Sequence, residues 1–288
     1  MRENHWSCEE IREFSTDKIL QKLNNFGIPM TPEKFLEDVQ NSYGGIEIAD
    51  RWEKDYTITA EHLDLDFPWM AAIVLWERLA PDRMSNEQLD DLIDQGYDLI
   101  EYNYNEAKAC TIWLEVWEHL KQRCDPDVKS IEAAAKGFND SFELYNWCQD
   151  LELYLGDAAL ENSDYYYPRI TYCQEFCQRF PETEEEILVN MKRAEAESHF
   201  YLGKIEEGEK LFQDLVDQFP RSAWGYIGWG DMYCFQPKNL PLPVDYVKAE
   251  KIYKTALKNN VDEPKVIRDR LRSLAKKTGG KGFGGSKS

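Results

Sequence analysis

The stretch "WGYIGWGDMY" (residues 224–233) sets Gly225, Gly228 and Gly230 among tryptophan and tyrosine residues. Glycines this dense belong either to a loop that cradles a phosphate or to a helix that packs closely against its neighbours. A phosphate loop needs a preceding strand and a spacing such as G-x-G-x-x-G, whereas this stretch has G-x-x-G-x-G and no strand pattern before it. A glycine inside a helix costs about 1 kcal/mol relative to alanine, and close helix contact offsets that cost. We therefore predict a helix-packing site.

Helical periodicity runs along nearly the whole chain, and no segment sustains the alternation of strands joined by hairpin turns. Residues 85–100 begin with Ser85 and Gln88 in the spacing of a capping box, and apolar residues follow at intervals of three and four. Residues 105–122 carry a second apolar stripe, made of Cys110, Trp113, Leu114 and Trp117. Two such helices joined by a few polar residues predict an antiparallel hairpin. The predicted fold class is all-α.

The same hairpin pattern recurs in the last third of the chain, which is the mark of a repeat protein. In residues 189–220, the small Ala196 lies within the first helix and Gly203 lies at the turn before the second. Thr183 and Glu186 precede this unit with the spacing of another capping box. We therefore expect Thr183 to cap the first helix.

Two further copies flank this unit. The next one starts at Trp224 and ends with the helix predicted at 246–258, after an inserted proline-rich loop at 235–244. A weaker copy runs through 150–181 and ends in Phe180-Pro181, just as the 189–220 unit ends in Phe219-Pro220. The recurrence of this Phe-Pro pair indicates one helical hairpin per repeat.

These residues resemble the tetratricopeptide repeat over about residues 150–275. The 189–220 unit departs from that family at Lys192 and Gly208 but matches it at Ala196, Gly203, Phe212 and Pro220. The next unit has the inserted loop and no closing proline, and it matches at Trp224, Ile227, Gly228, Tyr246, Ala249, Tyr253, Ala256 and Leu257. The resemblance implies a right-handed α-solenoid of helix hairpins with an extended concave surface.

A narrower resemblance rests on "IWLEVWEHLK" (112–121) together with "GWGDMY" (228–233), which is similar to a group of uncharacterised bacterial repeat proteins. Members of that group often carry a C-terminal zinc-binding SEC-C motif. This sequence has no cysteine after Cys234, so the motif is absent.

The sequence divides into three predicted parts. Residues 1–66 form a small helical N-terminal cap, in which Thr31 and Pro32 mark the start of one helix. Residues 67–278 form the solenoid, beginning with the apolar run 67–76, which has about half the roughly 20 residues of a membrane span and is predicted to be a buried helix. Residues 279–288, rich in Gly, Lys and Ser, are predicted to be a disordered tail.

The net negative charge of the chain limits the kinds of molecule that it can be expected to bind. The net charge is −20, and eight Lys/Arg against one acid after residue 264 leave 26 bases and 53 acids, or −27, in residues 1–264. Because nucleic-acid affinity comes largely from neutralised phosphates, we expect no nucleic acid on the main body. The expected partner is a protein or peptide that is basic or has an accessible terminus, and the alternative is that the acid excess only keeps the surface solvated. The start "MRENHWSCEE" lacks the apolar core of a signal peptide, so we expect a cytoplasmic protein with reduced thiols and no membrane contact.

No motif for catalysis, metal or cofactor stands out. The four histidines, His5, His62, His119 and His199, are far apart, and neither H-E-x-x-H nor C-x-x-C occurs. Cys173 and Cys177 lie one helical turn apart and are interpreted as core thiols rather than zinc ligands. We therefore predict no catalytic residue, no metal and no cofactor.

The residues predicted to bind a peptide are those that would line the concave wall of the solenoid. In the 189–220 repeat these residues are Asn190, Arg193, Glu197 and Tyr201, and Phe200 faces the same groove. In the next repeat they are Trp229 and Tyr233, and Gly225 and Met232 face the groove with them. Arginine offers a two-pronged donor for carboxylates, and aromatic side chains suit an anchor pocket. The alternative is that the aromatic residues are core and that Arg193 pairs with local acids.

The sequence therefore favours a non-enzymatic protein- or peptide-binding scaffold that uses the concave groove of a helical-repeat solenoid. A peptide-sensing bacterial regulator is the alternative, and an enzyme with its site in the groove is a third. The oligomeric state stays open.

Overall fold

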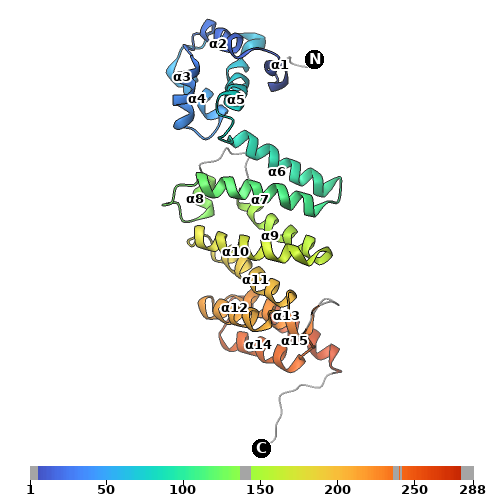
Figure 1. The fold of residues 1–288 in the computed structure, drawn as a ribbon. Helices are drawn as coiled ribbons and strands as arrows, with labels where there is room; N and C mark the ends of the chain where they lie inside the picture. The colour runs from blue at the N-terminus through green and yellow to red at the C-terminus, as the bar shows by residue number, and fades with distance from the viewer. Residues whose placement is uncertain (1–5, 137–143, 236–239, 241, 280–288) are drawn as a thin grey trace, which may run out of the picture. The chain divides into compact units, whose positions relative to one another are not determined.

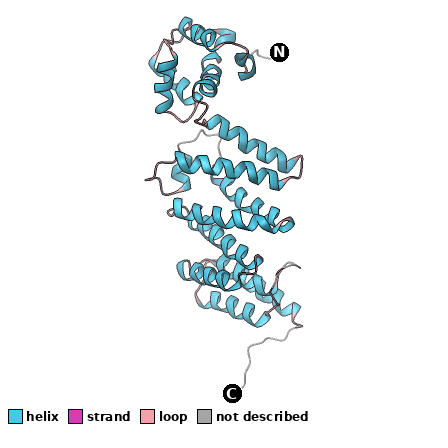
Figure 2. Ribbon diagram, in the orientation of Figure 1, coloured by secondary structure: helices cyan, strands magenta, loops and turns pink. Residues whose placement is uncertain are grey.

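The computed structural model describes residues 6–136, 144–235, 240 and 242–279 of the 288-residue chain. Within these residues the protein consists of fifteen α-helices and two short 3-10 helices, and no strand occurs (Figure 2). The all-α prediction is confirmed. The chain forms two compact units, residues 1–103 with 112–123 and 135–143, and residues 104–111 with 124–134 and 144–288.

The first unit is built around one apolar helix, α5 (Phe67–Leu79). Four helices pack against it: α1 (Cys8–Arg12), α2 (Thr16–Asn25), α3 (Pro32–Gln40) and α4 (Gly45–Asp55). Residues 67–76 are therefore a buried helix, as predicted, but they belong to the N-terminal core rather than to the repeats. The N-terminal helical core extends past residue 66, where the sequence placed its end, because this strongly apolar helix supplies its centre.

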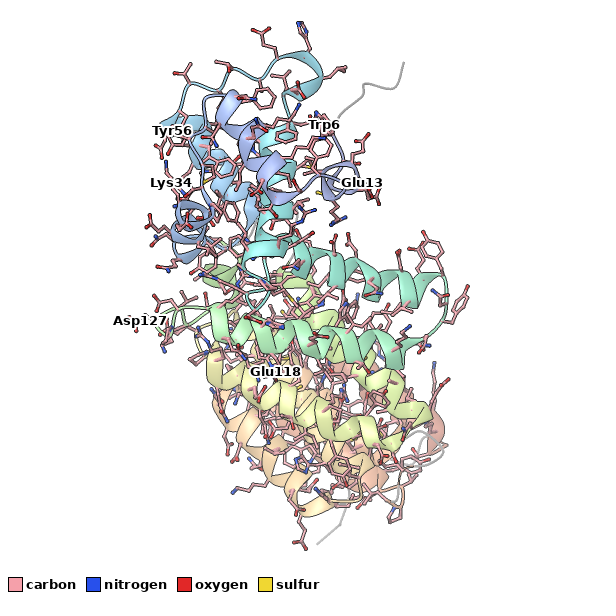
Figure 3. All side chains as sticks on the ribbon, turned by 45° about the horizontal axis from the view of Figure 1, so that its top comes forward. Trp6, Glu13, Lys34, Tyr56, Glu118 and Asp127 are labelled. Carbon is pink, nitrogen blue, oxygen red and sulfur yellow. The ribbon has the colours of Figure 1, made fainter. Side chains whose placement is uncertain are left out.

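Local signals fix the ends of these helices. Thr31 caps α3 by accepting a hydrogen bond from the Lys34 amide at 3.3 Å, and Pro32 occupies the first helical position, as predicted. Lys34 then donates to the hydroxyl of Tyr56, which follows α4, at 2.7 Å (Figure 3). These contacts join α3 to the end of α4.

A helical hairpin follows in α6 (Asn86–Glu101) and α7 (Glu106–Arg123). Ser85 and Gln88 form the predicted capping box, with the two hydrogen bonds at 2.8 and 3.2 Å. The Trp113 indole donates to the Ile93 carbonyl at 3.1 Å, and its ring occupies the space that a side chain at Gly96 would need. The short connection and this close contact confirm the predicted hairpin.

The second unit is a series of helices in which successive helices pack against each other (Figure 1). Its helices are α8 (Ile131–Ala135), whose last residue falls in the first unit, α9 (Leu144–Glu161), α10 (Tyr166–Arg179), α11 (Glu185–Tyr201), α12 (Ile205–Gln218), α13 (Ala223–Cys234), α14 (Tyr246–Lys258) and α15 (Pro264–Lys277). The starts of α9, α11, α13 and α15 are almost evenly spaced along the chain, and α9, α11 and α13 each pack against the following helix. A short 3-10 turn (Ser163–Tyr165) precedes α10.

The turns between these helices have the predicted causes. Phe180 and Phe219 end α10 and α12 with nearly the same backbone angles, φ near −125° and ψ near 60°, because the following proline disfavours a helical residue before it. Gly203 ends α11 with φ +74°, a conformation that favours glycine. Half of the predicted loop at 235–244 and all but the first residue of the predicted tail at 279–288 lie outside the described residues.

The predicted capping box at the start of α11 is wrong. The residue before α11 is Glu184, which makes no side-chain cap. The buried Thr183 hydroxyl instead accepts a hydrogen bond from the Ile131 amide at 3.0 Å, at the start of α8. A buried N–H needs a partner, and Thr183 supplies it to a segment 52 residues away.

Candidate functional site

The three glycines of residues 224–233 all lie inside α13, so the helix-packing prediction is confirmed. A β-carbon at Gly230 would collide with the ring of Tyr253 on α14. One at Gly228 would lie 2.7 Å from Arg193 Cδ on α11, and one at Gly225 would lie 3.3 Å from Leu215 on α12. Three different helices therefore approach α13 closely. Its side chains have different surroundings on the side that faces α12 and α14 and on the side that faces α11.

One side of α13 faces α12 and α14. There the Trp229 ring stacks on Phe212 with a centroid distance of 6.2 Å, and its indole donates to Glu209 Oε1 at 2.6 Å. Tyr233 also donates to Glu209, and Lys248 of α14 lies 2.6 Å from Glu209 Oε2. The carboxylate of Glu209 therefore gathers donors from both α13 and α14.

A groove of about 600 Å³ opens on this side of α13, between α12 and α14. That volume lies within the range of ligand-binding clefts, about 300 to 1,000 Å³. Its base is apolar and aromatic, and it comprises Val216, Tyr226, Trp229 and Ile252. The α12 wall consists of Glu209, Gln213 and Asp217. The α14 wall consists of four residues of the helix, together with the residue before it and the residue after it: Val247, Lys248, Lys251 and Thr255, with Asp245 and Asn259.

The two ends of the groove differ. Near the start of α12 and α14, the Glu209–Lys248 ion pair bridges the walls. At the other end, Asn259 donates to the Tyr226 hydroxyl at 2.6 Å. Between these points Asp217 accepts a hydrogen bond from its neighbour Gln213 at 2.9 Å, and Lys251 is exposed to solvent on the opposite wall. The groove therefore presents an acidic side chain and a basic one across an apolar base.

The other side of α13 belongs to a row of six alternating charges on five helices. Its members are Glu152 on α9, Arg169 on α10, Arg193 and Glu197 on α11, Asp231 on α13 and Arg270 on α15. Ion pairs join the first four members and, separately, the last two, and the two sets interact through Arg193, which lowers the pKa of Asp231. The separations include 3.5 Å for Arg193–Glu197, 3.9 Å for Arg169–Glu197 and 3.0 Å for Arg270–Asp231. Each carboxylate has an arginine partner, so the row is neutral as a whole.

Arg169 is the most enclosed cation of this row. Its Nε donates to Glu152 at 2.9 Å, and its Nη1 donates to the buried Ser198 hydroxyl at 3.3 Å. Burial raises the pKa of Glu197, although Arg193 and Arg169 lower it. Burial likewise raises the pKa of Asp231, opposed by its bonds with Tyr253 and Arg270. Every carboxylate of this row is paired with an arginine, so the row ties neighbouring helices together.

The six predicted site residues do not form one site. Arg193 and Glu197 belong to the charged row, and Tyr201 of the same helix stacks on Tyr166 with a centroid distance of 4.9 Å. Asn190 is half-buried on α11. Trp229 and Tyr233 lie on the side of α13 that faces α12 and α14.

The helix geometry of α13 explains why Trp229 and Tyr233 do not share a wall with Arg193 and Glu197. Gly228 and Asp231 meet Arg193 and Arg270, and successive residues turn about 100° around the axis. Trp229 and Tyr233 are therefore carried away from the charged row. Four of the residues expected on or beside the concave wall are buried: Phe200, Gly225, Met232 and Tyr233. Packing explains these positions, which agrees with the alternative interpretation that the aromatic residues are core.

The groove residues that the sequence interpretation missed lie on the second helices of the hairpins. Glu209, Gln213 and Asp217 repeat at intervals of four along α12, beside the buried Phe212 and Val216. That polar row is visible in the sequence. Its significance depends on α14, which belongs to the next hairpin and supplies the opposite wall.

Other sites of chemistry are equally limited within the described residues. No group of three His, Cys, Asp or Glu in residues 6–136 and the later described ranges could hold a metal ion. Cys173 is buried and Cys177 half-buried, and all seven cysteines are free thiols. Among the helices that the structure describes, none is both long and apolar enough to cross a membrane. In comparisons with protein-family models, curated proteins and solved structures, no match to this chain was found.

Proposed function

We propose that this protein is a non-enzymatic scaffold that binds a peptide segment of a partner protein. The binding site would be the α12–α14 groove. The observation that carries the proposal is the groove itself, about 600 Å³ in volume, with an aromatic base and charged side chains on both walls. Apolar clefts with a few well-placed polar groups are the usual form of a binding site, and tryptophan and tyrosine are the residues most often central to protein recognition.

The proposal includes the finer fold that the tetratricopeptide resemblance implies, a right-handed α-solenoid of helix hairpins with an N-terminal helical cap. The nearly even spacing of the starts of α9, α11, α13 and α15 supports a repeat of one hairpin. Such repeats offer extended surfaces for partners. The binding surface proposed here uses the second helix of each hairpin, in place of the first helices on which the sequence interpretation relied.

The chemistry of the groove favours binding over catalysis. Histidine, cysteine and serine do not occur among the described residues that line it, and each of its carboxylates, which could also act as a base, accepts a hydrogen bond within the protein. Glu209 is held by Trp229, Tyr233 and Lys248, so its carboxylate is already engaged. The net charge of −20 favours a partner whose binding segment carries basic residues. Seven free thiols fit a reducing compartment such as the cytoplasm.

The test is a selection of displayed 16-residue peptides on the full-length protein, followed by affinity measurements with purified peptides. Thr255 is exposed and lines the groove, so the Thr255→Arg variant inserts a long side chain into the groove without touching the core. We expect this variant to bind the selected peptides at least tenfold more weakly than the wild type.

The matched control is Gln218→Arg, which adds the same charge at an exposed position of α12 outside the groove. This variant should bind like the wild type. Equal affinities for the wild type and Thr255→Arg would contradict the proposed site, and a selection that enriches no peptide would contradict the proposed function.

A further inference from the structure

The two walls of the groove are helices whose backbone groups are already paired, and this limits what the groove can accept. An extended peptide would bring unpaired N–H and C=O groups against the apolar residues Val216, Trp229 and Ile252. A helical segment satisfies its own backbone, and it needs only an apolar stripe to cover that base. The α14 wall spans Asp245 to Asn259, about 21 Å at 1.5 Å per residue, which matches nearly four helical turns.

The walls carry opposite charges where they are open to a ligand. Glu209 and Lys248 neutralise each other at the bridged end. Farther along, Asp217 is exposed on the α12 wall, and Lys251 is exposed on the α14 wall. Asp245 is occupied at the start of α14, where its carboxylate accepts the Lys248 amide at 2.9 Å. A ligand in the groove therefore meets a negative wall on one side and a positive wall on the other.

Resting on the proposed function, we infer that the groove binds an amphipathic α-helix of a partner and that its oppositely charged walls set the direction in which that helix lies. The fitting helix has an apolar stripe with basic residues along one flank and acidic residues along the other. Rotating such a helix end to end exchanges its flanks. Only one direction then pairs both flanks with the walls, and the reverse direction sets like charges against each other on both sides.

The inference is tested with three stapled 16-residue peptides whose helicity is confirmed by circular dichroism. All share one apolar stripe, and their flanks carry lysine and glutamate, lysine on both sides, or glutamate on both sides. For the full-length wild type we expect the mixed peptide to bind about fivefold to tenfold more tightly than either uniform peptide, since exposed ion pairs contribute modestly.

Charge reversal of one wall at a time should change this order. Asp217→Lys makes both walls basic, so the glutamate peptide should bind tightest, and Lys251→Glu makes both walls acidic, so the lysine peptide should bind tightest. Asp214→Lys and Lys258→Glu make the same charge changes at exposed positions outside the groove, on α12 and α14. These two controls should keep the wild-type order.

Direction is measured with a photo-crosslinker at the N-terminus of the mixed peptide and of an isomer with exchanged flanks. We expect one peptide to crosslink near Asp245 and the other near Asn259. Crosslinks at the same end for both peptides would overturn the inference, as would an order of affinities that the wall variants leave unchanged.

The outcomes also separate this inference from the proposed function. Equal binding of all three helical peptides, lost in Thr255→Arg, would overturn the directional inference and leave the groove as a peptide site. If the helical peptides did not bind while the selected peptides still did, the directional inference would likewise be overturned and the groove would remain a peptide site. Failure of selected and helical peptides alike would overturn both proposals.

Discussion

Gly225, Gly228 and Gly230 each admit a different neighbour to the backbone of α13. At Gly230 the neighbour is held in place: Tyr253 is fully buried, and its hydroxyl donates to Asp231. At Gly225, the neighbours Leu215 and Val216 would stand 3.3 Å from an added methyl group and need to shift by only a few tenths of an ångström. The presence of a packing site was predictable from the glycine spacing, but the identity of each neighbour was not.

Gly230→Ala is expected to destabilise the protein by about 1–3 kcal/mol, because overpacking against Tyr253 outweighs the helix propensity gained. Gly225→Ala is the matched control, with an expected change of less than about 1 kcal/mol in either direction. Chemical denaturation of the two variants and the wild type measures both effects. A Gly230→Ala protein as stable as Gly225→Ala would contradict the packing described for α13 and α14.

At the scale of helices, the charged row adds ion pairs to helices that already pack against one another. Arg169 of α10 connects Glu152 of α9 with Glu197 and Ser198 of α11. Breaking a buried pair by removing one partner costs far more than the pair itself contributes, because the remaining charge is buried without compensation. The row therefore matters most for holding neighbouring hairpins in register.

Arg169→Met is expected to lower the free energy of unfolding at pH 7 by about 3–5 kcal/mol. Burial already raises the pKa of Glu197, and loss of Arg169 removes a cation that opposes this rise. In the variant, the folded state then binds a proton at pH values where the unfolded carboxyl, with a pKa near 4.3, stays ionised. Stability of the variant relative to the wild type should rise as the pH falls from 7 toward 5.

Denaturation of both proteins at pH 7 and pH 5 measures this difference. Adding Glu152→Gln and Glu197→Gln to the Arg169→Met variant should remove most of the pH dependence, because both carboxylates that lose Arg169 are then gone. A cost that stays constant between the two pH values, or one that grows at pH 5, would contradict the assignment of Glu197 to this row.

Helices and hairpins were predictable because their signals are local. Ser85 with Gln88, Thr31 with Pro32, and the prolines after Phe180 and Phe219 all act within a few residues of the helix ends that they define. Thr183 had the same kind of local signal, yet its hydroxyl serves Ile131, 52 residues away. A local pattern does not reveal when a distant donor competes for the same side chain.

At the scale of the whole chain, the predicted site residues lie on different sides of their helices for a geometric reason. One residue changes the direction of a helical side chain by about 100°, so assigning Trp229 and Tyr233 to the same wall as Arg193 required a register that the sequence does not contain. The groove walls come from α12 and α14, which belong to successive hairpins with all of α13 between them in the chain. Similarly, the apolar α5 was predictable as a buried helix, whereas its place at the centre of the first unit depends on four other helices.

The central claim is that a peptide binds between α12 and α14, and hydrogen–deuterium exchange of the full-length protein tests it most directly. Exchange is followed with and without the tightest selected peptide at saturation. The account predicts slower exchange in residues 205–218 and 246–258, with little change in 185–201, the helix that carries Asn190, Arg193 and Glu197. Protection of residues 185–201 without protection of the two groove helices would contradict the account and return the site to the face first expected from the sequence.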